Sequence, residues 1–291
     1  MAAPLLEPQL LRRLEALALM VRRAVKGQTG GERRSVSRGR SPEFADFRNY
    51  TPGDDYRLID WNAYARLDRF VLRLFVAEEE LPLSLFVDLS GSMDWGRPNK
   101  AAVARRLAGA IAYVALASLD RVRLTVFAEG PTSGGAPYRG RHAAQELFAR
   151  IQSFPAGGPT DYSRLVSPIT RQRPGMTVVI TDGLGTSPVE PAIRALHHAR
   201  QEGAVLQLLA PQEISLEWTG DARLKDAETG VEREFTATPA TQAAYRTALA
   251  QRTDEIERAA GRHGLRFARL TTDQPIEDMV HRTLRQLGLL G

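Results

Sequence analysis

Three short segments combine aspartate with hydroxyl residues in a pattern that could bind a metal ion. Asp88 is followed by Ser90 and Ser92, while Thr160 and Asp182 lie in two later segments. Carboxylate and hydroxyl oxygens suit hard divalent cations such as Mg2+, with Mn2+ or Ca2+ as alternatives. Two carboxylates would balance the charge of the cation, and water would fill the rest of its shell. Such a site can accept one more carboxylate from outside.

Each of these residues also has an ordinary structural explanation. Thr160 could cap the helix that is expected to follow it. Asp182 precedes Gly183, and an Asp-Gly pair is common in turns that end strands. Ser90 and Ser92 could cap a local turn. The joint occurrence of three such segments favours a shared site over three unrelated turns.

Both aspartates follow segments that are typical of buried strands. The largely apolar residues 83–87 lead into Asp88, and residues 176–181 lead into Asp182. Short apolar runs bounded by turn residues indicate strands that are covered on both faces. Open α/β sheets bind ligands at the carboxyl ends of their strands. We therefore expect the two aspartates and the loop of Thr160 to meet at one edge of a sheet.

Predicted strands and helices alternate along most of the chain. This order predicts an α/β fold, a doubly wound and mostly parallel sheet with helices on both faces. Helices are expected at 8–26, 100–119, 142–154, 188–201, 240–263 and 275–290. Strands are expected at 70–77, 83–88, 121–129, 176–182, 205–210 and 265–270. A turn-rich hairpin is expected at 130–140.

Three parts of the chain differ in composition. Residues 1–40 combine the N-terminal helix with a basic connector, at 27–40, that is rich in glycine, serine and arginine and is expected to be flexible. Residues 41–81 mix aromatic and charged side chains, and residues 82–291 form the main domain. Within the main domain, an antiparallel insertion is expected at about 212–238.

The segment 41–81 has no clear helical or strand period. We expect an ordered segment crosslinked by arginine–carboxylate pairs, because Phe44 and Trp61 are side chains that favour burial. A contact surface for a partner is the other interpretation. The strand at 70–77 is expected to form a hairpin with the strand at 83–88 and so to lie at the edge of the sheet.

Composition excludes several classes of site. The 291 residues include no cysteine, which excludes disulfides, thiolate zinc sites and a cysteine nucleophile and favours the cytoplasm. The apolar stretches are too short to predict a membrane span, and charged residues interrupt the N-terminus where a signal peptide would be apolar. The net charge of +5 is dispersed along the chain, so we expect no specific binding of nucleic acid.

The three aspartate and hydroxyl segments resemble a known metal site. Asp-Leu-Ser-Gly-Ser at 88–92, the Gly-Gly-Pro-Thr-Asp loop at 157–161 and Ile-Thr-Asp-Gly at 180–183 resemble the von Willebrand factor A (VWA) domain with its metal-ion-dependent adhesion site. The resemblance implies a metal, Mg2+ or Mn2+/Ca2+, that is bound directly or through water by Asp88, Ser90, Ser92, Thr160 and Asp182. Pro159 departs from the family's pattern and fixes the backbone next to Thr160.

A second set of residues resembles the bacterial DUF58 family, which places it just before such a domain. The set is partner-binding or structural and comprises Glu43, Arg48, Tyr50, Asp54, Arg57, Asp60, Trp61 and Arg66. Residues 226–230, Asp-Ala-Glu-Thr-Gly, resemble the insertion of the same family. Together the two resemblances cover about residues 39 to 290.

The family resemblance implies a protein-interaction module and not an enzyme. Such a module is expected to act in the cytoplasm beside an AAA+ ATPase of the MoxR type, in chaperone-like assembly or maturation of a client protein. An Asp or Glu of the partner would complete the Mg2+ shell.

Two alternatives remain open. A Mg2+-dependent phosphatase or hydrolase would use Asp88 as its nucleophile. Phosphatases of the haloacid dehalogenase type usually carry a second aspartate two residues later, where this chain has Ser90. The other alternative is a metal-free scaffold with a degenerate site, in which residues 43–66 supply the contacts.

Overall fold

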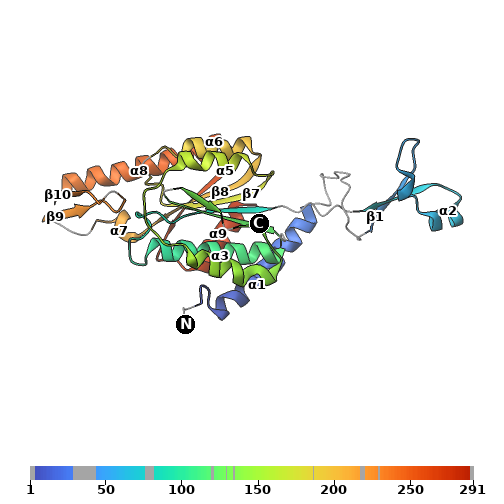
Figure 1. Cartoon of the computed structure of the whole chain (residues 1–291), viewed down its shortest axis with the longest axis horizontal. Coiled ribbons are helices and arrows are strands. Elements are labelled where there is room, and N and C mark those ends of the chain that lie inside the picture. Colours follow the sequence, from blue (N-terminus) through green and yellow to red (C-terminus); the bar gives the residue numbers. More distant parts are fainter. Residues whose placement is uncertain are drawn as a thin grey trace. The chain divides into compact units, whose positions relative to one another are not determined.

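The computed structural model describes residues 4–28, 44–75, 82–118, 121–128, 130–133, 135–185, 187–216, 220–228 and 230–288. The chain forms two compact units, residues 1–26 with 81–291 and residues 27–80, which are described separately (Figure 1). Most of the predicted connector at 27–40, together with Glu43, lies outside the described residues.

The larger unit is built on a seven-stranded sheet in the part of the chain that the structure describes. Its strand order is β11-β8-β7-β3-β4-β5, and β6 also pairs with β4. The five strands from β11 to β4 are parallel, and β5 and β6 are antiparallel to β4. Their bounds are β3 (Leu83–Asp88), β4 (Arg121–Phe127), β5 (Pro131–Ser133), β6 (Tyr138–Arg139), β7 (Gly175–Thr181), β8 (Gln201–Leu209) and β11 (Arg266–Thr271).

Helices cover both faces of this sheet, which confirms the predicted doubly wound α/β fold. One face packs against α1 (Pro8–Gln28), α3 (Lys100–Ser118), α4 (Ala144–Ser153) and α9 (Ile276–Gln286). The other packs against the short helix η3 (Tyr162–Leu165) and against α5 (Val166–Thr170), α6 (Glu190–His198) and α8 (Pro239–Arg262). Figure 1 shows α3 and α6 on opposite sides of the strands. A further short helix, η2 (Arg141–Ala143), precedes α4.

The central strand β3 is buried along its whole length, as its apolar sequence predicts. Leu85 and Val87 join the hydrophobic cluster on the α3 face, and Phe86 joins the cluster on the α6 face. This alternation follows from the pleat of a strand, which points successive side chains to opposite faces. Both faces of β3 therefore contribute to the core, and its carboxyl end is held in place.

Helix α3 is apolar because it also lies in the core. Among the described helices, it alone is long and apolar enough to cross a membrane, and 72% of the relevant window is buried inside the protein. Its many alanines allow close packing on the sheet. The composition of α3 is therefore accounted for by its place in the core.

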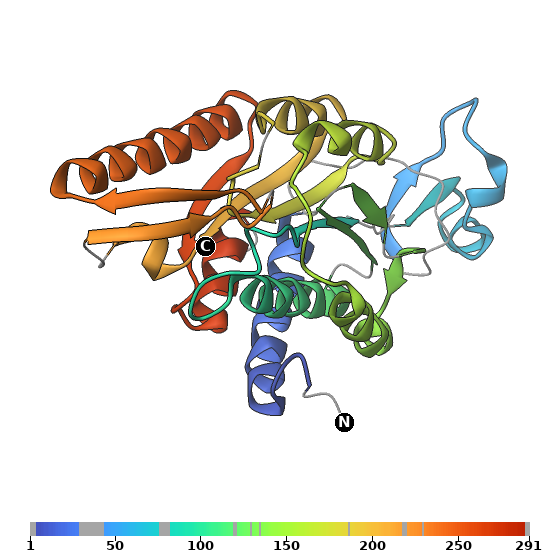
Figure 2. The ribbon, with the colours of Figure 1, turned by 60° about the vertical axis from the view of Figure 1, so that its left-hand side comes forward.

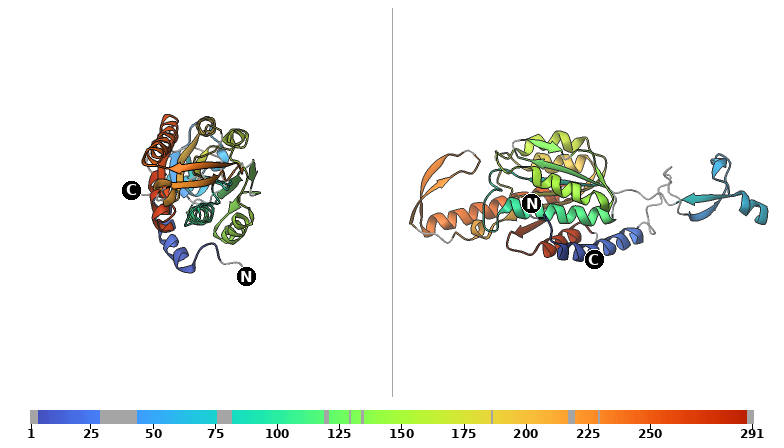
Figure 3. Two further views of the ribbon diagram at one scale, coloured as in Figure 1. Left: turned by 90° about the vertical axis from the view of Figure 1, so that its left-hand side faces the viewer. Right: turned by 60° about the horizontal axis from the view of Figure 1, so that its bottom comes forward.

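The predicted insertion forms a hairpin of β9 (Gly220–Lys225) and β10 (Glu232–Ala237), preceded by the short α7 (Pro211–Ile214). Figures 2 and 3 show the hairpin beside the N-terminal half of α8. Strand β8 begins at Gln201, four residues before the predicted start at 205. Gly203 permits this extension, since a side chain there would collide with the backbone of Thr177 on β7.

The smaller unit corrects one predicted strand pairing. Strand β2 (Val71–Phe75) pairs antiparallel with β1 (Phe44–Asn49) and not with β3. Strand β3 has β4 on one side and β7 on the other, so it offers no free edge to a hairpin partner. The prediction of an edge strand at 70–77 is therefore wrong.

The residues between β1 and β2 form the short helices η1 (Tyr56–Leu58) and α2 (Trp61–Leu67). Arg48 Nη2 donates to Asp54 Oδ1 at 2.7 Å, which is a crosslink of the predicted kind. Asp60 accepts from the backbone N–H groups of Asn62 and Ala63 and caps α2. The expected burial of Trp61 is wrong, because its side chain is 59% exposed. The burial of Phe44 lies outside what the structure describes.

Candidate functional site

The two aspartates lie at the carboxyl ends of adjacent strands. Asp88 is the last residue of β3, and Asp182 directly follows β7, the parallel neighbour of β3. The helices that follow these strands, α3 and α6, cover opposite faces of the sheet. This point is the topological switch of the sheet, the place where open α/β folds bind ligands.

Asp88 is fully buried and accepts hydrogen bonds on both carboxylate oxygens. Oδ1 accepts from the backbone N–H of Ser90 at 3.0 Å, and the hydroxyl of Thr160 lies 3.4 Å away. Oδ2 accepts from the hydroxyl of Thr181 at 2.6 Å. The hydroxyl of Tyr162 lies 2.8 Å from that of Thr181. Thr181 and Tyr162 were not predicted as site residues.

The loop of Thr160 is tied to the loop that follows Asp88. The N–H of Gly91 donates to the carbonyl of Gly158, and the N–H of Gly157 donates to the carbonyl of Leu89, each at 2.8 Å. Asp161, and not Thr160, caps the following helix η3, through a bond from the N–H of Ser163. The capping explanation of Thr160 is therefore wrong.

The five predicted residues come from three loops. Thr160 is fully buried next to Asp88, and Pro159 does not move it away. The hydroxyls of Ser90 and Ser92 lie 3.1 Å apart, and Ser90 is fully buried. The structure thus gathers oxygen atoms of several loops around the carboxyl end of β3.

A lysine lies within this group of carboxylates. Lys100, the first residue of α3, is fully buried, and its Nζ donates to Asp182 Oδ2 at 2.8 Å and to Glu213 Oε1 at 2.5 Å. Asp182 Oδ1 accepts from the backbone N–H of Leu184. Both oxygens of Asp182 are therefore engaged, so it would act on a metal through remaining lone pairs or through water.

Neither Lys100 nor Glu213 was predicted. The sequence signal for Lys100 was a lysine at the start of a helix that is otherwise apolar and rich in alanine. Glu213 lies on α7, and its other oxygen, Oε2, accepts from the N–H of Ala210 at 2.7 Å.

The buried charges leave an excess of negative charge. Burial is the main cause that raises the pKa of Asp88 to about 7, and the charge of Asp182 is the second. The hydrogen bonds from Thr181 and Ser90 lower this pKa but do not offset the rise. Burial lowers the pKa of Lys100. The charges of Asp182 and Glu213 and their hydrogen bonds outweigh this effect, so the pKa of Lys100 lies above its usual value. Lys100 pairs with Asp182 and Glu213, and its single positive charge cannot balance these two carboxylates and Asp88 together. An additional cation would relieve this imbalance.

The donor set fits a hard cation such as Mg2+, since it consists of carboxylate and hydroxyl oxygens. Among the described residues, no three His, Cys, Asp or Glu side chains are grouped so that they could hold a metal. The candidate site contains two carboxylates and therefore depends on hydroxyls and water for its other ligands.

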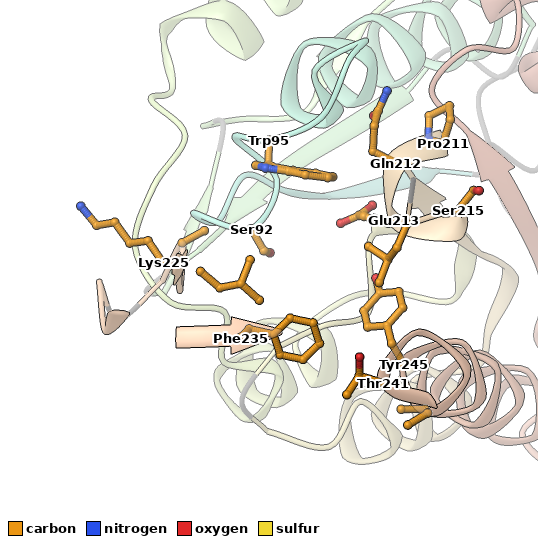
Figure 4. A pocket seen from close by; sticks show the side chains of 15 residues that line it. Ser92, Trp95, Pro211, Gln212, Glu213, Ser215, Lys225, Phe235, Thr241 and Tyr245 are labelled. Carbon is orange, nitrogen blue, oxygen red and sulfur yellow. The ribbon is translucent and has the colours of Figure 1, made fainter. Parts of the chain in front are cut away.

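A pocket of about 1080 Å3 opens next to the candidate site, and Ser92 belongs to both. It lies between the loop after β3, helices α7 and α8, and the β9–β10 hairpin. Figure 4 shows the ring of Trp95 across the cavity from that of Phe235, with Lys225 at the outer edge. The lining is mainly apolar and includes Trp95, Leu216, Leu224, Phe235 and Tyr245. Trp95 and Leu224 are partly exposed, so the pocket can contact a partner.

The fold and the site define an open α/β protein with an oxygen-rich centre at its switch point. Residues 46–255 match the family described as "Protein of unknown function DUF58", and the chain belongs to this family.

Two curated relatives illustrate the family. The uncharacterized protein Rv1480 of Mycobacterium tuberculosis is 32% identical over 276 residues, which cover 92% of this chain and 86% of the relative. The uncharacterized protein MAV169 of Mycobacterium avium is 33% identical over 147 residues, which cover 48% of this chain and 86% of that protein.

Similar solved structures include the conserved hypothetical protein BatB of Bacteroides thetaiotaomicron. It is 16% identical, with a TM-score of 0.45, over 72% of this chain and 98% of BatB. The manganese-loaded TRAP protein of Plasmodium vivax is 18% identical, with a TM-score of 0.36, over 45% of this chain and 58% of TRAP.

The raised pKa of Asp88 predicts how stability depends on pH in the absence of metal. Asp88 retains its proton in the folded state up to about pH 7, while the unfolded chain loses it near 3.8. Stability is therefore lost as the pH rises through this range. We expect Asp88→Asn to be about 1–3 kcal/mol more stable than wild type at pH 8 in chelator, with a smaller difference at pH 5.

Chemical denaturation at both pH values measures this difference. Asp161→Asn, at a half-buried carboxylate that caps η3, is the matched control and should show no such change with pH between 5 and 8. A variant Asp88→Asn that is less stable than wild type at pH 8 in chelator would contradict the account.

The second prediction concerns Lys100. Lys100→Met would leave Asp182 and Glu213 buried without their cation, and we expect it to lower the free energy of unfolding by about 3–5 kcal/mol. Denaturation with urea measures this loss. Lys225→Met, at an exposed lysine at the edge of the pocket, should change stability by less than about 0.5 kcal/mol. Equal effects of the two substitutions would show that the buried ion pair is not important for stability.

Proposed function

We propose that this chain is a metal-dependent protein-interaction module whose candidate site binds a carboxylate of another protein. The observation that carries the proposal is the buried oxygen cluster around Asp88, with more negative charge than Lys100 can balance. Asp88, Ser90, Ser92, Thr160 and Asp182 would hold Mg2+, directly or through water. The bound metal supplies an electrophilic coordination position that an Asp or Glu side chain can occupy.

The neighbouring pocket supports a protein segment as the partner. Ser92 lines the pocket and belongs to the candidate site, so one ligand can reach both. A carboxylate at the metal and an apolar side chain in the pocket would together give more specificity than a free anion could.

The family resemblance supports a proposal for the partner. We propose an AAA+ ATPase of the MoxR type as partner, with a client protein that the pair assembles or matures in the cytoplasm. The motifs at 88–92, 157–161 and 180–183 and the segment before the main domain support this assignment.

Co-purification tests the proposed function. Tagged wild-type chain should retain the MoxR-type ATPase in Mg2+ and lose it in EDTA, and Asp88→Ala should fail to retain it even in Mg2+. Asp161→Asn is the matched control and should behave as wild type. Retention of the ATPase by Asp88→Ala, and by wild type in EDTA, would contradict the metal-dependent mechanism.

The scaffold alternative is favoured by one observation in the smaller unit. Tyr56, Trp61 and Phe70 are exposed aromatic side chains, and such residues often serve as anchors in protein interfaces. If the contacts come from this segment and not from the metal, Trp61→Ala will abolish co-purification and EDTA will have no effect.

A hydrolase remains the other alternative, and the position of Lys100 near Asp182 is the observation that bears on it. Lys100 is fully buried and bound to two carboxylates, so it does not offer its ammonium to a phosphate. We expect no turnover of phosphate monoesters in Mg2+. Turnover that disappears in Asp88→Asn would favour the hydrolase instead.

A further inference from the structure

The tip of the β9–β10 hairpin lies directly on the loop of the candidate site. A side chain at Gly91, between Ser90 and Ser92, would place its Cβ only 2.4 Å from the carbonyl oxygen of Ala227. Glycine is therefore required at position 91 by the close approach of the hairpin. The insertion thus lies against the loop that carries Ser90 and Ser92.

The hairpin brings its own carboxylate to this place. Glu228 follows Ala227 and is half-buried. Burial is the main effect on the pKa of Glu228 and raises it, while hydrogen bonding from the backbone and hydroxyl of Thr160 and from the hydroxyl of Ser92 acts against this shift. The charge of Asp182 also acts on this carboxylate. Glu228 therefore lies next to Thr160 and Ser92, two of the hydroxyl residues of the candidate site.

One oxygen of Glu228 is buried without a partner. Oε1 has no hydrogen bond to any residue that the structure describes. A buried carboxylate oxygen without a donor is costly, and a cation would satisfy it. A purely structural role would leave this cost uncompensated.

The turn that carries Glu228 is well defined. The N–H of Asp226 donates to the carbonyl of Val231, and that of Gly230 donates to the carbonyl of Asp226, each at 2.9 Å. The N–H of Glu228 donates to Asp226 Oδ1, also at 2.9 Å. These bonds fix the direction of the backbone at the tip.

We propose that Glu228 is an internal ligand of the site, with Asp182 acting through water, and that Glu228 occupies the position that a carboxylate of a partner would otherwise take. This inference rests on the proposed metal-dependent function. A partner must displace Glu228 to bind. The apparent affinity for the partner is therefore the intrinsic affinity multiplied by the fraction of molecules in which Glu228 has left the site. The insertion then acts as a competitor within the same chain, and only a ligand that also contacts another surface, such as the neighbouring pocket, displaces it efficiently.

Titration of the full chain with Mn2+ alone tests this role. We expect Glu228→Gln to bind Mn2+ about ten-fold more weakly than wild type, because one carboxylate ligand is lost. Water proton relaxation should show one more exchangeable water on the Mn2+ bound to Glu228→Gln than on that bound to wild type. Glu232→Gln, an exposed glutamate on the same hairpin, should match wild type in both measurements.

Acetate provides the second measurement. At constant ionic strength, replacement of chloride by acetate should tighten the binding of Mn2+ to Glu228→Gln. Acetate can then bind to the metal at the position that Glu228 has left, so the binding of Mn2+ and the binding of acetate are coupled. Wild type should not respond, because Glu228 already occupies the position.

The outcomes separate this inference from the proposed function. If neither wild type nor Glu228→Gln binds Mn2+, the proposed metal-dependent function is wrong. If both bind it with equal affinity, equal numbers of bound water and equal responses to acetate, Glu228 is not an internal ligand, and the proposed function stands.

Discussion

The burial of carboxylates at the carboxyl ends of two adjacent strands is the constraint on which the rest of this structure depends. Asp88 and Asp182 are fully buried, and burial of a charge is expensive unless a partner compensates it. Lys100 compensates part of the charge from the start of α3, and the hydroxyls of Thr181 and Thr160 supply hydrogen bonds. The remaining negative charge suits a cation, and this need gives the site its proposed function.

The fold supplies the positions, and these follow from local sequence. The apolar segments before Asp88 and Asp182 predicted two buried strands, and the order of strands and helices predicted the doubly wound sheet. Parallel strands end at the same edge, so the meeting of the loops could be predicted before any contact was known. Chain order and apolar patterning are properties that can be read from neighbouring residues.

The contacts that complete the site could not be read in this way. Lys100 meets Asp182 and Glu213 across 82 and 113 residues of sequence, and no local pattern links them. Glu228 lies at the tip of the β9–β10 hairpin, whose approach to Gly91 joins residues far apart in the sequence. Strand β2 was assigned to the wrong partner, since only the complete sheet shows that β3 has no free edge. Specific side-chain contacts and strand pairings between residues far apart in the sequence therefore could not be predicted.

The site joins a charged centre, an apolar pocket beside it and a hairpin that brings Glu228 next to Ser92 and Thr160. The central claim is that a divalent metal binds between the loops of Asp88 and Thr160. Anomalous diffraction from crystals grown with Mn2+ tests this claim most directly. The account predicts one manganese peak at the carboxyl ends of β3 and β7, next to Asp88, Ser90 and Ser92. Well-ordered crystals that show these loops, but no manganese between them, would contradict it.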